Sequence, residues 1–169
     1  TADADNGWTN EANAYVSDNG YGVTNNNNED AEFFNFGLTI PGGATINGIE
    51  VAVEGNATGT REVAVDLSSG AGYTAGDPST TFTNGGTDAT LLFGGNANLW
   101  GRAWTPADIS NLRVRLTSNN GTGDVNIDQI QVKVHFTLPN TAPNAPSSVN
   151  QYRTDATTVI AQGGYTNQT

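Results

Sequence analysis

Alternation of apolar and polar residues is the feature that most constrains how this chain folds. Between Gln129 and Phe136, Gln, Lys and His occupy every second position, and Ile, Val and Phe fill the positions between them. A period of two places one set on each face of a β-strand, with one face buried and the other solvated. The same alternation predicts strands at 34–40, 49–54, 62–67, 112–116 and 125–138, and weaker patterns predict short strands near 12–16, 73 and 89–93.

These segments together predict the class of fold. About eight strands separated by turn-forming residues are typical of an all-β antiparallel β-sandwich or jelly roll, with a closed barrel as the alternative. The three commonest residue types, with 23 Thr, 22 Asn and 21 Gly, favour pleated strands and turns. Only 105–110 has a helical pattern, because Thr105 can cap it, Pro106 suits its first turn and Asp108 complements its dipole.

The charge balance of the chain limits its partners. Seventeen acidic residues against six Lys and Arg give a formal net charge of −11, although charged residues make up only 14% of the chain. Nucleic acids and anionic membrane surfaces are bound through basic patches, so neither is an expected partner, and no apolar run predicts a membrane span. A neutral polar surface and a start at Thr1, which suggests a removed leader, favour an extracellular or cell-surface location.

The sequence contains few residues suited to catalysis. It has no cysteine, one histidine, and no G-x-S-x-G, phosphate-binding loop or H-E-x-x-H pattern. The histidine, His135, lies on the polar side of a predicted strand, where we expect it to be solvated or paired. Carboxylates such as Glu50 and Asp66 lie on open strand faces, where pairing with Arg or Lys is the usual arrangement. We therefore predict that the protein is not an enzyme.

Acidic residues gather at the N-terminus, where residues 1–32 hold seven acids and no base. Calcium requires about six to eight oxygen ligands in a flexible geometry, which carboxylates, Asn side chains and carbonyl groups can supply. The stretch lacks the terminal glutamate of an EF-hand loop, and a solvated acidic surface is the alternative to a specific site. The candidate Ca²⁺ ligands are Asp3, Asp5, Asp124 and Asp128.

The character of the sequence changes at Pro139. We expect a β-sandwich domain over 1–138, a Pro/Asn-rich extended spacer over 139–150, and a tail over 151–169. The tail contains a strand-like run that no later segment of the chain can pair with. Such a run is a candidate for docking on a neighbouring subunit. Its residues are Thr157, Thr158, Val159, Ile160 and Ala161.

The three tryptophans fall outside the alternating segments, in surroundings rich in Asn and Gly. Trp8, Trp100 and Trp104 are expected to fill the ends of the sandwich, because Trp is usually largely buried. The alternative is that they, together with Tyr21 and Tyr73, stack on sugar rings.

Three segments resemble a known group of proteins. FGLTIPGGATINGIEVAVEG (36–55), LWGRAWTPADISNLRVRL (99–116) and VNIDQIQVKVHFT (125–137) resemble jelly-roll, lectin-like β-sandwich modules of secreted, repetitive surface proteins of bacteria and archaea. The resemblance covers about residues 8–137 and implies a fold and an extracellular location, without any catalytic residue. The tail, from TAPNAPSSVNQYRTD onwards, resembles the Pro-rich beginning of a following Ig-like domain.

Two functions of different classes fit these features. The first is an extracellular structural subunit that binds other copies of itself head to tail, forming a filament or tube through the C-terminal strand, with Ca²⁺ bridging as a candidate addition. The alternative is a carbohydrate-binding or adhesive module of a cell-surface protein, in which exposed aromatic residues stack on glycans.

Overall fold

The structure is a computed structural model that describes residues 2–4, 7–70, 72–74, 79–83, 85, 87–140, 151–152 and 159–160. The chain divides into two compact units, Thr1–Pro139 and Asn140–Thr169. The elements of the first unit are β1 (Ala2–Ala4), η1 (Glu11–Ala14), β2 (Gly22–Thr24), β3 (Glu29–Phe34), β4 (Thr45–Ala57), β5 (Thr60–Ser68), β6 (Ser79–Thr83), β7 (Ala89–Gly94), α1 (Pro106–Ser110), β8 (Arg113–Gly121) and β9 (Val125–Thr137).

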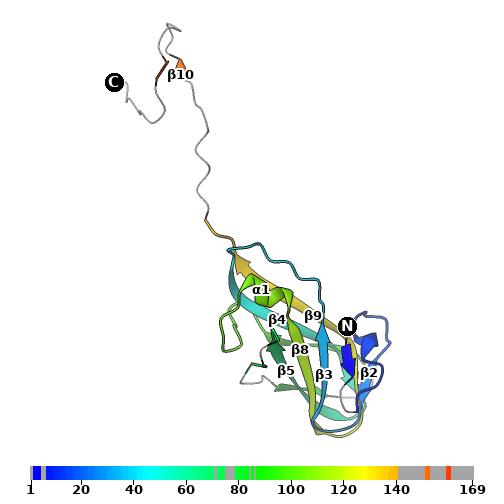
Figure 1. Cartoon of the computed structure of the whole chain (residues 1–169). Coiled ribbons are helices and arrows are strands. Elements are labelled where there is room, and N and C mark those ends of the chain that lie inside the picture. The colour runs from blue at the N-terminus through cyan, green and yellow to red at the C-terminus, as the bar shows by residue number, and fades with distance from the viewer. Residues whose placement is uncertain are drawn as a thin grey trace. The chain divides into compact units, whose positions relative to one another are not determined.

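The strands of the first unit form two antiparallel sheets packed face to face. One sheet has the order β1-β3-β8-β5-β6 and the other the order β2-β9-β4-β7. Figure 1 shows β3, β8 and β5 side by side in one layer. Each sheet ends in edge strands with one neighbour among the described residues, so the fold is an open sandwich of the jelly-roll class and not the closed barrel. The predicted fold class is confirmed.

The core lies between the two sheets and is built from the alternating apolar positions. Val51 and Ile127 from the four-stranded sheet, and Val65 and Leu116 from the five-stranded sheet, are fully buried. Positions next to them along the same strands include polar residues that point outward, such as Glu50, Arg115 and Asn126. The alternation thus gives each sheet one outer face, and the polar side chains of the strands lie on these two faces.

The helical turn α1 forms where the sequence predicts it. The Thr105 side chain accepts a hydrogen bond from the Asp108 backbone N–H at 3.1 Å, and the Asp108 carboxylate accepts one from the Thr105 N–H at 2.9 Å. This is a capping box, and its hydrogen bonds lower the pKa of Asp108. No helix in the described part of the chain is long and apolar enough to cross a membrane.

Two predicted strands are wrong. The alternation over 34–40 is not a strand, because Asn35 (φ 62°) and Gly37 (φ 70°) adopt left-handed conformations that interrupt the pleat. Strand β3 instead precedes it, and Phe36 and Leu38 still pack against the core from an irregular segment. The predicted strand at 12–16 is the 3-10 helix η1, which follows Asn10 in a left-handed conformation (φ 57°).

In the second unit, β10 (Gln151–Tyr152) pairs with β11 (Val159–Ile160) in an antiparallel ladder. Val159 and Ile160 of the tail run therefore have a partner within the chain, which is a preceding segment and not a later one. Thr157, Thr158 and Ala161 lie outside the described residues.

Candidate functional site

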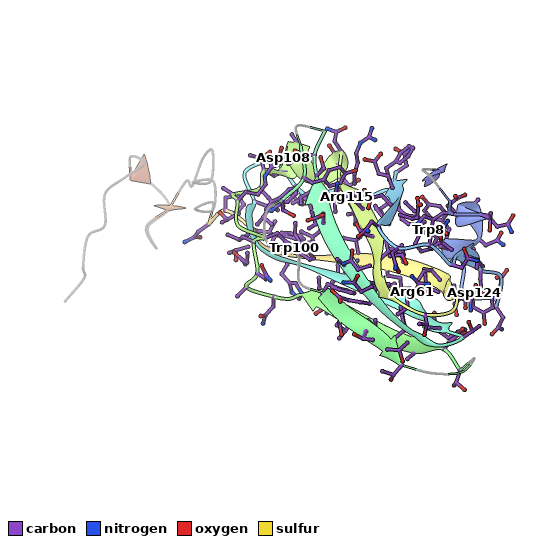
Figure 2. All side chains as sticks on the ribbon, turned by 90° about the horizontal axis from the view of Figure 1, so that it is seen from below. Trp8, Arg61, Trp100, Asp108, Arg115 and Asp124 are labelled. Atoms are coloured by element: carbon purple, nitrogen blue, oxygen red, sulfur yellow. The ribbon has the colours of Figure 1, made fainter. Side chains whose placement is uncertain are left out.

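The three tryptophans are built into the sandwich. Trp8, Trp100 and Trp104 are 5%, 5% and 6% exposed. Figure 2 places Trp100 toward the end that carries Asp108, and Trp8 toward the end that carries Asp124. Each indole N–H donates to a backbone carbonyl at 2.9–3.0 Å: Glu29 for Trp8, Ile49 for Trp100 and Leu99 for Trp104. A sugar ring therefore has no open indole face to stack on, and the tryptophans act as packing residues.

Tyr73 is held by charged groups on the outer face of the five-stranded sheet. Its hydroxyl donates to the Glu32 carboxylate, and the Arg115 guanidinium lies 4.1 Å from the centre of its ring. Burial, followed by the hydrogen bond to Glu32, raises the pKa of Tyr73. One face of the ring is thus already covered by a cation, and the hydroxyl group is already hydrogen-bonded.

Of the candidate Ca²⁺ ligands, Asp128 is 1% exposed and is already satisfied locally. Its Oδ1 accepts hydrogen bonds from the backbone N–H groups of Asp18 and Asn19, both at 3.1 Å. Asp3 lies in β1 and Asp124 follows β8, whereas Asp5 is outside the described residues. Within the described ranges, no group of three or more His, Cys, Asp or Glu side chains could hold a metal ion. The calcium prediction thus has no assembled site in this part of the chain.

Tyr21, the remaining aromatic candidate, lies at the outer face of the four-stranded sheet. It precedes β2 at one edge of this sheet, and its hydroxyl donates to Asp88, which precedes β7 at the opposite edge, at 3.2 Å. A second acceptor, Asn19 Oδ1, lies at 3.4 Å. Burial and the neighbouring Asp88 carboxylate raise the pKa of Tyr21, and an opposing hydrogen bond with Asn56 lowers it. The Tyr21 side chain is partly exposed and is fixed at its hydroxyl end.

A row of hydrogen bonds across the sheet supports this tyrosine. Asn126 of β9 donates to the side-chain oxygen of Asn56 of β4 at 2.8 Å, and Asn56 donates to Asp88 at 2.7 Å. Asn56 is 4% exposed although it lies on the outward side of β4, so other groups cover it. The row Asn126–Asn56–Asp88–Tyr21 joins both edges of the sheet and sets the position of the Tyr21 ring.

Beyond this row, the outward side chains follow the β4–β9 register. Glu54 lies opposite Gln129, and Glu50 lies opposite Lys133. No side-chain hydrogen bond or ion pair joins these four residues, or Gln131, to another described residue. On β7, Leu92 is 64% exposed. This outer face consists of Glu50, Ala52, Glu54, Asn56, Thr90, Leu92, Asn126, Gln129, Gln131 and Lys133.

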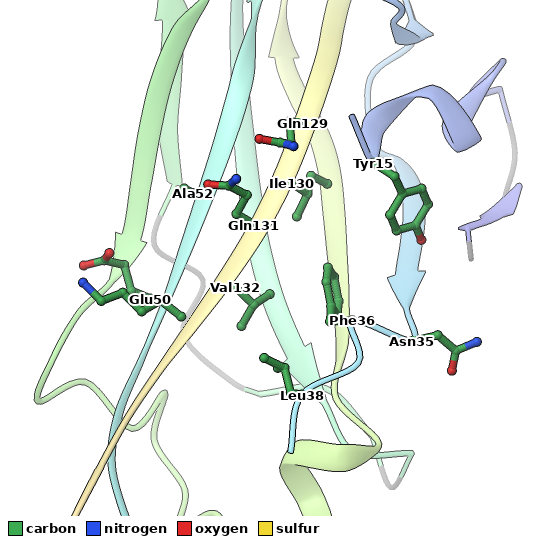
Figure 3. Close-up of a pocket in the computed structure, with 11 residues that line it drawn as sticks. Tyr15, Asn35, Phe36, Leu38, Glu50, Ala52, Gln129, Ile130, Gln131 and Val132 are labelled. Carbon is green, nitrogen blue, oxygen red and sulfur yellow. The ribbon is translucent and has the colours of Figure 1, made fainter. Parts of the chain in front are cut away.

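A groove of about 480 Å³ adjoins the outer face and runs round the edge of β9. β2 pairs with β9 only as far as Ile127, and Tyr15 forms a single antiparallel bridge with Gln129, so no named strand covers this edge of β9 beyond that bridge in the described part of the chain. Phe36 and Leu38 from the irregular segment line the groove together with Val132, beside Gln129 and Gln131 (Figure 3). The groove therefore combines an apolar wall with planar amide groups, and it contains both hydrogen-bond donors and acceptors.

Sequence reasoning identified Tyr21 but not its supporting groups. Gln129 and Gln131 were visible as polar positions of a predicted strand, whereas Asp88 and Asn126 carried no signal of their own. Their proximity to Asn56 depends on the pairing of β4 with β9 and on the loop before β7, which are long-range features.

No protein-family model matches this chain, and no curated protein matches it. Solved structures that resemble it include a CBM4 carbohydrate-binding module (12% identity, TM-score 0.45, covering 69% of this chain and 72% of that one). Others are the CBM22-1 xylan-binding domain from Paenibacillus barcinonensis (11%, TM-score 0.46, 79% and 84%) and CBM35 from the same organism (16%, TM-score 0.44, 79% and 98%). These TM-scores are all below 0.5, so no ligand is carried over to this chain.

Proposed function

We propose that this protein is a carbohydrate-binding module, and that it binds glycans on the outer face of the four-stranded sheet and in the adjoining groove. The observation that carries the proposal is a set of polar side chains on this face, beside a positioned Tyr21, that form no side-chain hydrogen bond or ion pair with another described residue. This set includes Gln129, Gln131 and Glu54. Glycan hydroxyls both donate and accept hydrogen bonds, as amide groups do, and the C–H faces of sugar rings pack on aromatic rings.

The groove supplies the second requirement of a binding surface, which is concavity. Most ligand sites are concave, with apolar walls and a few well-placed polar groups. Phe36, Leu38 and Val132 provide the apolar wall, and the amides of β9 provide the polar groups. Because the neutral polar surface is typical of exported proteins, we place this module outside the cell or on its surface.

Self-assembly through the tail stays a prediction. Val159 and Ile160 pair with β10, so donating this strand to a neighbouring copy would require that ladder to open. The glycan-binding function has more support, because it uses Gln129, Gln131 and Glu54, whose side chains form no hydrogen bond or ion pair with another described residue.

The test is glycan binding by the full chain and by two variants. Affinity gel electrophoresis against a panel of soluble polysaccharides, followed by calorimetry on those that retard the protein, measures binding. We expect Tyr21→Ala to weaken binding at least about fivefold, because stacking on an aromatic ring contributes about 1 kcal/mol beyond the buried area. Tyr73→Ala is the matched control on the other sheet and should bind as the parent chain does. If no polysaccharide retards the parent chain, the proposal is wrong.

A further inference from the structure

The charges around the outer face indicate which glycans it can bind. We propose that the site takes uncharged glycans and discriminates against chains that carry carboxylate or sulfate groups; this inference rests on the proposed function. Glu50 and Glu54 point outward from β4. A third carboxylate, Asp88, accepts a hydrogen bond from Asn56 and lies at the β7 edge of the same sheet. The lysine on this face, Lys133, lies directly opposite Glu50 in the register, so its neighbour on β4 carries a negative charge.

No described arginine is available to this face. A guanidinium group is the side chain best suited to bind carboxylate or sulfate, because it can donate two parallel hydrogen bonds. Arg102 pairs with Asp108 and stacks 4.3 Å from the ring centre of Trp104. Arg113 and Arg115 belong to β8 in the other sheet and pair with Glu32, Asp30 and Asp66.

Arg61 is the fourth described arginine, and its charge is buried. It is 2% exposed, and its guanidinium donates only to oxygens of the protein. Four of these acceptors are backbone carbonyls, and the fifth is an Asn side chain. They belong to Asn25, Asn26, Asn27, Asn119 and Gly123. This guanidinium links residues 25–27 to residues 119–123 by hydrogen bonds, and its burial keeps it from an external anion.

The field of the whole chain acts in the same direction. A net charge of −11 lowers the local concentration of polyanions near the surface, and the effect is strongest at low ionic strength. Neutral hydroxyl groups lack this penalty, since a carboxylate such as Glu54 accepts a hydrogen bond from a hydroxyl group but repels another carboxylate. The amides of Gln129 and Gln131 complement hydroxyls equally well as donors and as acceptors.

The experiment compares matched glycans that differ at C6, where one member carries a hydroxyl group and the other a carboxylate. Neutral β-glucan, β-galactan and mannan are each tested beside their own derivative, in which the C6 hydroxyl is oxidised to a carboxylate. Binding to the full chain is measured at low and at near-physiological salt. We expect the oxidised derivative to bind about tenfold more weakly at low salt, with a smaller gap at higher salt. The variant Glu54→Gln should reduce the gap, whereas the same substitution on the other sheet, Glu62→Gln, should leave it unchanged.

The possible outcomes separate this inference from the proposed function. Equal or tighter binding of the oxidised derivative, with neutral binding retained, overturns the charge selectivity but leaves glycan binding intact. If Glu54→Gln and Glu62→Gln show the same difference in affinity between neutral and oxidised glycans, the discrimination comes from the overall charge. The claim that the charges of this face contribute to it is then overturned. Absence of binding to both members of every pair defeats the proposed function, and this inference with it.

Discussion

The outer faces of the two sheets are built from the same alternation but use their polar side chains in opposite ways. On the five-stranded sheet, Arg115 donates to Asp66 through Nε at 3.2 Å and lies 3.7 Å from Asp30, and Arg113 pairs with Glu32. On the four-stranded sheet, the outward glutamines and glutamates have no such partners among the described residues. On the first face these five charged residues pair with one another, whereas the second face leaves its glutamines and glutamates open to solvent or to a ligand.

This difference gives the two faces different expected roles, one in the stability of the fold and the other in binding a ligand. Groups that satisfy one another hold strands together and offer little to a ligand, because any new contact must first replace an existing one. Groups that contact only water give up less when a ligand arrives. We therefore expect substitutions on the five-stranded face to change the free energy of unfolding, and substitutions on the four-stranded face to change glycan affinity.

The largest expected effect comes from breaking the Arg115–Asp66 pair. The Asp66 side chain is 2% exposed, so Arg115→Met would leave a buried carboxylate without its cation. We expect a loss of about 3 kcal/mol in the free energy of unfolding, because an unpaired buried charge costs far more than a missing surface ion pair. Urea unfolding followed by tryptophan fluorescence measures this value.

The control for this prediction removes both charges at once. The double variant Arg115→Met with Asp66→Leu replaces the pair by apolar groups and should recover most of the lost stability. A loss below about 1 kcal/mol in the single variant would mean that water already solvates Asp66. The proposed contrast between the two faces would then be weaker than the geometry indicates.

The fold was largely predictable from the sequence, because period-two alternation and turn residues are local signals. The capping box at Thr105 and the longest strands follow from residues close together in the chain. The prediction failed at 34–40, where the apolar alternation is real but Asn35 and Gly37 take left-handed conformations. In a strand, alternating burial usually accompanies backbone pairing with a neighbouring strand. Beyond Phe34 this segment keeps the alternating burial but is not part of a strand.

The candidate site was only partly predictable, for a physical reason. Sequence reasoning expected the tryptophans to fill the ends of the sandwich, with stacking on sugars as the alternative. Their burial agrees with that expectation, because an indole whose N–H finds a backbone carbonyl is stable inside the protein, as Trp100 is with Ile49. The row that positions Tyr21 joins residues more than thirty positions apart, such as Asn56 and Asp88. Such contacts follow from strand order, which single-sequence alternation does not determine.

An intermediate effect is expected from Tyr73→Phe, which removes the hydrogen bond to Glu32. The loss at neutral pH should be about 1 kcal/mol. Burial and Glu32 raise the pKa of Tyr73 in the folded state above its unfolded value near 10. The stabilisation is therefore present below pH about 10 and is lost as the pH rises above it, because the unfolded chain releases the proton first.

Unfolding free energies of the parent chain and of Tyr73→Phe, measured from about pH 8 to about pH 11, check this sign. The difference between the two should shrink as the pH rises. Tyr21→Phe, on the other face, should cost less, because its hydroxyl contacts are longer, at 3.2 and 3.4 Å. A larger stability loss in Tyr21→Phe than in Tyr73→Phe would contradict the assignment of structural contacts to the five-stranded face.

The smallest effect on stability, and the sharpest test of the contrast, is expected from Gln131→Ala. Gln131 is exposed, lines the groove and has no side-chain partner among the described residues, so its removal should change the free energy of unfolding by less than about 0.5 kcal/mol. Glycan affinity should nevertheless fall about fivefold, because the ligand loses a hydrogen bond made in a partly desolvated groove. Calorimetry and urea unfolding of the same preparation give both values. If Gln131→Ala keeps its glycan affinity, the β9 amides are not part of the binding surface. If it loses stability, the side chains of this face stabilise the fold, as those of the other face do.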